Sequence, residues 1–275
     1  MLLQTPISIP SAPFVVSPSD RFLFVGSCFA QNIGRRMADN QFRTMINPFG
    51  VMYNPASIVH TLQREGCLDV QVPDVVVLTL GTNHVYIRKT TNEIVDNCRK
   101  EPQSLFREEE LSVAQCVHYL YHCVDLLVHC NPQVRIIFTV SPIRYAKYGF
   151  HESQLSKSTL LLAVHQLLNM TPSIAAANAV LHYFPSYEIM NDELRDYRFY
   201  APDMLHPSEQ AVDYIFERFS ATYFSAEAHR FVSEWQPIGK ALSHKPFHPD
   251  SADYQQFMSS VQEKLAAFRR KYHLD

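Results

Sequence analysis

The stretch Phe-Leu-Phe-Val-Gly-Ser-Cys-Phe-Ala, residues 22–30, decides the fold of this chain. Its apolar run stops abruptly at Gly26 and Ser27, as in a strand that is buried on both faces of a sheet. Helical spacing follows at once, so Ser27 stands between the end of a strand and the start of a helix. Open α/β sheets bind their ligands at this edge. We therefore expect Ser27 to be exposed, either as a nucleophile or as a simple helix N-cap.

The rest of the chain repeats this alternation of strand and helix. Short apolar runs bounded by turn residues predict four further strands, at residues 42–46, 75–80, 134–140 and 180–184. Helical patterns fall between them, and a hairpin is expected at residues 85–96. The alternation predicts a mostly parallel sheet with helices on both faces. The carboxyl ends of its strands would gather four residues on one rim, namely Ser27, Gly50, Asn83 and Ser141.

The prolines divide the chain into three parts. Residues 1–21 hold several prolines and serines and predict an extended lead-in, while residues 22–235 form the sheet domain. Residues 236–275 are expected to be a linker, beginning at Pro237, followed by an amphipathic helix. This last helix is expected to pack on the domain or on a second copy of the chain, which would give a homodimer.

Composition excludes several classes of function. The 275 residues carry a formal net charge of −3 and no long basic run, which argues against binding to nucleic acid or to an anionic membrane. No apolar stretch approaches the roughly 20 residues of a membrane span, and the first residues lack the features of a signal peptide. We expect a cytoplasmic protein with no membrane insertion.

The cysteines and histidines do not indicate a metal site. Cys116, Cys123 and Cys130 recur every seven residues along one predicted helix, which favours packing in the core. His118 and His122 lie four apart on the same helix, but no acidic residue at a useful spacing completes a ligand set. The sequence also lacks a glycine-rich phosphate loop, so we expect neither a metal nor a cofactor.

A late turn supplies two groups that a serine nucleophile needs. Asp203 and His206 lie three apart between prolines, so the carboxylate can reach one imidazole nitrogen while the other faces a partner. Asp203 would then orient the base, and His206 would accept the proton of the serine. Alone, the pair is a weak signal and is more typical of an ordinary surface turn.

Several motifs together resemble the GSCFA family, which is similar to the SGNH or GDSL-like hydrolases. The resemblance runs from about residue 22 to 220. It rests on Gly26-Ser27-Cys28-Phe29-Ala30, Asn47-Pro48-Phe49-Gly50, Ser141-Pro142-Ile143-Arg144, Tyr183-Phe184-Pro185, Leu194-Arg195-Asp196-Tyr197-Arg198 and Asp203-x-x-His206-Pro207. It implies a flavodoxin-like three-layer α/β/α sandwich, here with a C-terminal helical extension.

The resemblance also implies roles for single residues. Ser27 becomes the nucleophile, His206 the base and Asp203 its orienter. The oxyanion hole would consist of the N–H groups of Ser27 and Gly50 and the side-chain amide of Asn83. The chain departs from the GDSL-like pattern in two places, because Cys28 follows the serine and His84 stands where many relatives have aspartate.

Two further sets of residues are candidates for the site. Cys28 is a rival nucleophile, since a helix N-terminus activates a thiol, but we expect its side chain to face the core. Arg144, Arg195 and Arg198 could bind a carboxylate or phosphate of a substrate, although the acidic residues around the last two favour internal ion pairs.

These observations predict a serine esterase or O-acyltransferase that acts on an acetyl-type ester. By analogy with the family, we expect this ester to be on a carbohydrate. Hydrolysis and transfer differ only in whether water or a bound hydroxyl resolves the acyl-enzyme. The alternative is a catalytically silent protein that uses the same fold for binding or as a scaffold.

Overall fold

The fold is built on a parallel sheet of five strands. A computed structural model describes residues 5–98, 100–170, 178–247 and 250–274. The sheet has the order β2-β1-β3-β7-β8, and all neighbouring strands are parallel. Its strands are β1 (Arg21–Gly26), β2 (Arg43–Ile46), β3 (Val75–Leu80), β7 (Arg135–Val140) and β8 (Val180–Tyr183). All five predicted strands are thus confirmed, in the order typical of flavodoxin-like folds.

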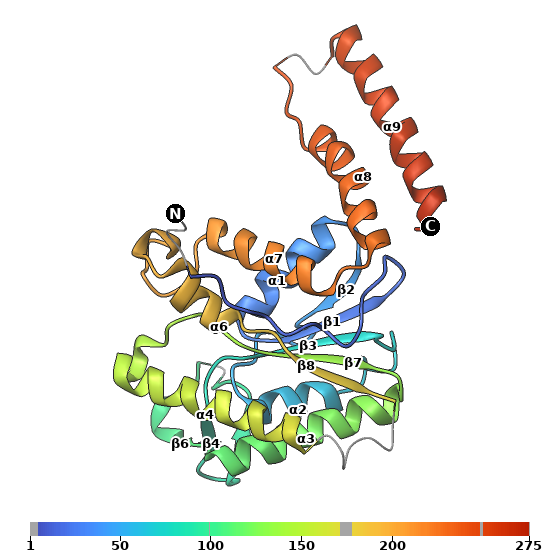
Figure 1. The fold of residues 1–275 in the computed structure, drawn as a ribbon. Coiled ribbons are helices and arrows are strands. Elements are labelled where there is room, and N and C mark those ends of the chain that lie inside the picture. The colour runs from blue at the N-terminus through green and yellow to red at the C-terminus, as the bar shows by residue number, and fades with distance from the viewer. Residues whose placement is uncertain (1–4, 99, 171–177, 248–249, 275) are drawn as a thin grey trace.

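Helices cover both faces of the sheet and complete a three-layer α/β/α sandwich (Figure 1). One face packs against α1 (Cys28–Asp39) and α7 (Glu209–Tyr223). The other packs against α2 (Pro55–Gln63), α3 (Val113–Cys130) and α4 (Phe150–Asn169). Successive residues of β1 alternate between the two cores: Phe22 and Phe24 face α1, whereas Leu23 and Val25 face α2. Short helical turns connect these elements, namely η1 (Gln103–Leu105), η2 (Ala146–Tyr148), α6 (Ser186–Glu188), η3 (Ile189–Leu194) and η4 (Tyr197–Phe199).

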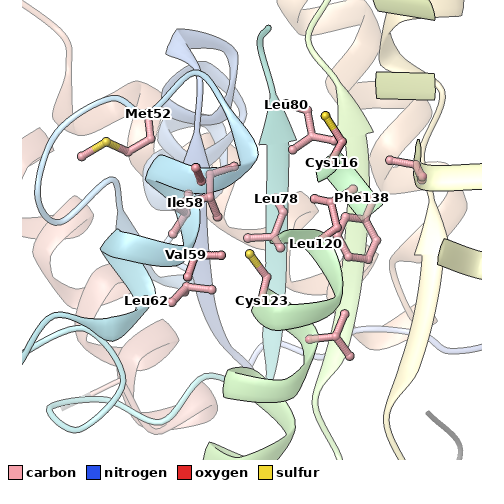
Figure 2. Packing of buried hydrophobic residues seen from close by; sticks show 14 of the residues in the cluster. Met52, Ile58, Val59, Leu62, Leu78, Leu80, Cys116, Leu120, Cys123 and Phe138 are labelled. Atoms are coloured by element: carbon pink, nitrogen blue, oxygen red, sulfur yellow. The ribbon is translucent and has the colours of Figure 1, made fainter. Parts of the chain in front are cut away.

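The cysteines of α3 belong to the second core. Figure 2 shows Cys123 near Leu78 of β3 and Val59 of α2, and Cys116 near Leu80 of β3. Both cysteines are fully buried, and burial raises the pKa of each thiol, that of Cys116 to about 12. The prediction that these two pack in the core is confirmed.

A small antiparallel sheet is inserted after β3. The predicted hairpin is confirmed as β4 (His84–Arg88) and β5 (Glu93–Val95), and β6 (Phe106–Glu110) pairs with the other side of β4. The sequence did not indicate β6, because its residues Phe-Arg-Glu-Glu-Glu show little strand propensity. Pairing with β4 overrides that local preference.

The C-terminal part forms a helical hairpin that extends away from the sandwich (Figure 1). It consists of α8 (Ala226–Leu242) and α9 (Ala252–Tyr272). The predicted linker from Pro237 is wrong, because Pro237 lies inside α8. Trp235 anchors α8 by donating to the Asp39 carbonyl at 2.6 Å, and its ring packs on Phe268 of α9 at 5.5 Å. Pairing of two chains through α9 stays a prediction.

Within the described residues, no helix combines the length and the apolar character that crossing a membrane requires.

Candidate functional site

Ser27 lies where β1 ends and α1 begins. It is the N-cap of α1, and its Oγ accepts the N–H of Phe29 at 3.3 Å. Gly26 is required before it: its φ is +142°, and an added Cβ would lie 2.1 Å from the Thr79 carbonyl oxygen. The prediction of an exposed serine is wrong, because Ser27 is only 1% exposed. The loop after β2 folds over this strand end, where Met52 donates to the Gly26 carbonyl at 2.9 Å.

Cys28 also differs from its prediction. It is partly exposed, and its Sγ lies 3.5 Å from the hydroxyl of Tyr53. As the first residue of α1, it points toward the loop that carries Tyr53 and away from the core. Cys28 therefore stands beside the serine with an accessible thiol.

Asp203 and His206 form the predicted pair. Oδ2 of Asp203 lies 2.6 Å from Nδ1 of His206, while Oδ1 accepts the backbone N–H groups of Leu205 and His206 at 2.9 and 3.0 Å. These backbone hydrogen bonds, followed by the one to the imidazole, lower the pKa of Asp203 to about 2. Both side chains are about half exposed. The carboxylate can therefore fix the imidazole with Nε2 directed outward.

Arg144 fixes this turn to the sheet edge. Its N–H donates to the Leu205 carbonyl at 3.0 Å, and its Nη1 donates to the Met204 carbonyl at 3.1 Å. Its guanidinium lies over the ring of Phe150, 3.9 Å from the centroid. Because Arg144 follows β7, it holds the Asp203–His206 turn at the carboxyl edge of the sheet. In the described part of the chain, Ser27 Oγ and the His206 imidazole share no hydrogen bond, a contact that often forms only with substrate bound.

The three predicted oxyanion donors are engaged elsewhere. Ser27 N–H donates to the Thr79 carbonyl at 3.1 Å, and Gly50 N–H closes a turn on the Asn47 carbonyl at 2.9 Å. Nδ2 of Asn83 donates to the Leu111 carbonyl at 2.8 Å. The structure therefore does not leave the two backbone groups free for a substrate, and it leaves Asn83 one amide hydrogen.

The turn after β3 is held tightly by α4. Ser156 Oγ accepts the Asn83 N–H and bonds the Thr82 hydroxyl, both at 3.0 Å. Lys157 donates from Nζ to the Gly81 carbonyl at 2.6 Å. Lys157 is almost fully buried, and desolvation lowers its pKa to about 7. These contacts from α4 fix the position of residues 81–83.

Asn47, in the turn after β2, is a residue to which the sequence analysis gave no role. Its Oδ1 accepts the Gly26 N–H at 2.9 Å, while its Nδ2 is buried without a hydrogen-bond partner among the described residues. Its φ of 42° is left-handed, which asparagine tolerates better than most residues. The motif Asn47-Pro48-Phe49-Gly50 was the available signal, since it belongs to the family resemblance.

A cavity of about 410 Å³ opens beside this rim. Four aromatic rings form a row along the cavity. Their centroids are 6.5 Å apart for Tyr53 and Tyr145, 5.4 Å for Tyr145 and Tyr148, and 4.0 Å for Tyr148 and His84. Burial lowers the pKa of His84 and favours its neutral ring. The other lining residues are Asn54, Thr82, Tyr86, Asp96, Asn97, Cys98, Glu101, Gln103 and Lys147.

Arg195 and Arg198 lie outside this cavity. Both side chains are largely exposed and lie near their acidic neighbours, Arg195 at 3.7 Å from Asp192 and Arg198 at 3.5 Å from Asp196. They line a separate hollow together with residues 5–7. Contact of either arginine with a substrate stays a prediction.

Across the described ranges, no group of three or more histidine, cysteine, aspartate or glutamate side chains is arranged to hold a metal ion.

Solved structures with a similar chain path include several esterases. A carbohydrate esterase family 3 protein from Talaromyces cellulolyticus is 10% identical with a TM-score of 0.43, covering 78% of this chain and 99% of its own. A catalytic mutant of Axe2, an acetylxylan esterase from Geobacillus stearothermophilus, is 13% identical with a TM-score of 0.46, covering 76% and 97%. A family two carbohydrate esterase from Clostridium thermocellum, in complex with cellohexaose, is 14% identical with a TM-score of 0.45, covering 75% and 64%.

Family membership rests on the sequence itself. No curated protein matches this chain. The GSCFA family matches residues 21–69 and 68–219, and the C-terminal domain of GSCFA domain proteins matches residues 235–275. The chain therefore belongs to the GSCFA family.

Proposed function

We propose that this chain is a serine-dependent esterase or O-acyltransferase that acts on an acetyl-type ester. The observation that carries the proposal is the Asp203–His206 pair, held by Arg144 at the sheet edge where Ser27 caps α1. A base with a fixed orienter and a hydroxyl at a helix N-terminus are the parts that acyl transfer needs.

The chemistry proceeds in two balanced steps. Ser27 Oγ attacks the ester carbonyl carbon while Nε2 of His206 takes the hydroxyl proton. The tetrahedral intermediate then breaks its bond to the leaving alcohol, which receives that proton from His206, and an acyl-Ser27 remains. Water or a second alcohol repeats the sequence and releases the acyl group. Asp203, with its pKa of about 2, stays ionised throughout and stabilises the imidazolium.

The tyrosine-lined cavity supports a carbohydrate as the alcohol part of the ester. Tyr53 ties one side of the cavity to Cys28, next to the nucleophile, and Tyr145 directly follows Arg144, which bonds the Leu205 carbonyl beside the base. Ser27, Asp203 and His206 do not themselves line the cavity, and these two tyrosines connect it to their neighbouring residues. A sugar ring presents C–H faces that pack on aromatic rings and hydroxyl groups that suit tyrosine and amide side chains.

Hydrolysis of 4-nitrophenyl acetate tests the proposed function. Ser27→Ala and His206→Ala should each lower kcat by about 10⁴-fold or more, because members of a triad act as a unit. Cys28→Ala is the matched control: it changes the neighbouring nucleophile and should retain most of the activity. Full activity of Ser27→Ala, or loss confined to Cys28→Ala, would contradict the proposal. An intact wild-type protein without turnover on aryl or sugar acetates would favour the silent binding protein instead.

A further inference from the structure

We infer that Nδ2 of Asn47 is a hydrogen-bond donor to the oxyanion that forms when Ser27 attacks its ester. This inference rests on the proposed function and adds a catalytic residue to it. It starts from one observation: the side chain that bonds Gly26, the residue before the nucleophile, has a buried donor with no partner among the described residues. Buried donors in folded proteins are nearly always paired, so this atom requires an explanation.

The orientation of the Asn47 carboxamide is fixed by its neighbour. The Gly26 N–H needs an acceptor, and Oδ1 of Asn47 supplies it at 2.9 Å. Exchanging the oxygen and the nitrogen would place two donors against each other, so the hydrogen-bond network allows one assignment. The unpartnered atom is therefore the donor Nδ2.

The position of Asn47 follows from the sheet. β1 and β2 are parallel, with Phe24 opposite Ile46, so Asn47 follows β2 beside the carboxyl end of β1. Its N–H donates to the Phe24 carbonyl at 2.8 Å, and its side chain reaches Gly26. Ser27 directly follows Gly26 in the chain. Nδ2 of Asn47 therefore lies close to the peptide that leads into the nucleophile.

Asn83 holds the corresponding place on the other side of β1, but with the opposite polarity. Its Nδ2 donates to the Leu111 carbonyl, and the acceptor Oδ1 is the atom without a partner among the residues that the structure describes. An oxyanion needs donors. Nδ2 of Asn83 keeps one hydrogen beside its bond to Leu111, whereas Nδ2 of Asn47 has no partner for either hydrogen among the described residues, so Asn47 offers the less engaged donor.

The test compares Asn47→Asp with Asn83→Asp on 4-nitrophenyl acetate. Aspartate keeps the Oδ1 acceptor for Gly26 and tolerates the left-handed φ, so Asn47→Asp removes the donor with little change in shape. We expect kcat to fall by about 10² to 10³-fold with KM within about threefold, as when one oxyanion donor is lost. Asn83→Asp removes the other side-chain amide and its bond to the Leu111 carbonyl, and should lower kcat by less than Asn47→Asp does.

A second variant removes the donor without adding a charge. Asn47→Gly suits the φ of 42° but also removes the Oδ1 acceptor of the Gly26 N–H. Because Asn47→Asp keeps that acceptor and Asn47→Gly adds no charge, a similar loss of kcat in both points to the donor that both lack. Asn131→Asp, whose Nδ2 donates to Pro73 before β3, is a control at the opposite sheet edge and should leave kcat unchanged.

The outcomes separate this inference from the proposed function. Folded Asn47→Asp and Asn47→Gly with near wild-type kcat, combined with an inactive Ser27→Ala, would overturn the role of Asn47 and leave the serine mechanism standing. An active Ser27→Ala would instead overturn the serine mechanism, and the inference with it. A larger loss in Asn83→Asp than in Asn47→Asp would assign the donor to Asn83.

Discussion

Two turns flank the end of β1 and differ in how they are held. The β2 turn, residues 47–50, carries Asn47, whose donor Nδ2 has no hydrogen-bond partner within the ranges that the structure describes. The β3 turn, residues 81–83, carries Asn83, whose Nδ2 bonds the Leu111 carbonyl and whose Oδ1 has no partner in the described part of the chain. Ser156 and Lys157 of α4 hold the β3 turn in place by hydrogen bonds to Asn83 and Gly81.

This difference suggests that the two turns have different roles in the proposed reaction. The clamped β3 turn positions Thr82 and leads into His84, which both line the tyrosine-rich cavity. The β2 turn touches the strand end that bears Ser27. Changes at the β3 turn should therefore affect stability and substrate affinity, whereas changes at the β2 turn should affect the chemical step.

The largest expected effect comes from Gly26→Ala, which alters the residue between the two turns. An added Cβ would lie 2.1 Å from the Thr79 carbonyl oxygen, and the φ of +142° is unsuited to alanine. We expect a loss of about 3 kcal/mol or more in the free energy of unfolding, measured by urea denaturation.

Gly50→Ala is the matched control for that loss. Its φ of +96° is also unfavourable, but an added Cβ meets no atom within 4 Å. It should cost about 1 to 2 kcal/mol from backbone strain alone. Equal losses in both variants would show that the contact of Gly26 with β3 contributes little.

Lys157→Met should remove a pH dependence of stability that belongs to the β3 turn. The pKa of Lys157 is lowered to about 7 in the folded state. Between that value and its ordinary value the unfolded chain binds the additional proton, so stability rises with pH in this window. From pH 7 to 8.5 we expect wild type to gain about 2 kcal/mol relative to Lys157→Met.

Urea denaturation of wild type and Lys157→Met at several pH values measures this difference. The other ionisable groups are the same in both proteins, so their contributions to the pH dependence cancel. Lys240→Met, on the exposed part of α8, is the control and should follow wild type. Parallel stability curves for wild type and Lys157→Met would mean that the lysine keeps its proton when buried.

The smallest expected effect is on substrate affinity in the cavity. Tyr145→Ala removes the ring between Tyr53 and Tyr148. We expect KM for an acetylated methyl xyloside to rise about tenfold, or about 1.4 kcal/mol, with kcat/KM for 4-nitrophenyl acetate within about twofold. Steady-state kinetics on both esters measure this.

Tyr121→Ala, an exposed tyrosine of α3 outside the cavity, should leave both esters unaffected. If Tyr145→Ala lowers the rates on both esters equally, the cavity does not recognise the sugar. If neither rate changes, the sugar binds elsewhere.

The sequence predicted the framework of the fold because its signals are local. Apolar runs ending in turn residues located all five parallel strands, and the helix cap at Ser27 was one of the two expected roles. The linker at Pro237 was wrong because α8 continues through the proline, stabilised by the packing of Trp235 and Ile238. Such tertiary packing is not visible in a local pattern.

The site was less predictable because its geometry depends on contacts between distant segments. The pairing of Asp203 with His206 followed from a spacing of three. The burial of Ser27 depends on the loop after β2, and the free donor of Asn47 depends on how that loop meets Gly26. The family resemblance assigned Asn83 as a donor, and only the structure shows that its Nδ2 already bonds the Leu111 carbonyl.

Labelling with a fluorophosphonate probe, followed by mapping of the modified peptide, tests the central claim most directly. The probe reacts with a serine that has both a base and an oxyanion site. We predict a single label on Ser27 in the wild type and slower labelling of Asn47→Asp by about 10²-fold. A label on Cys28, or no label on the intact folded protein, would contradict the account.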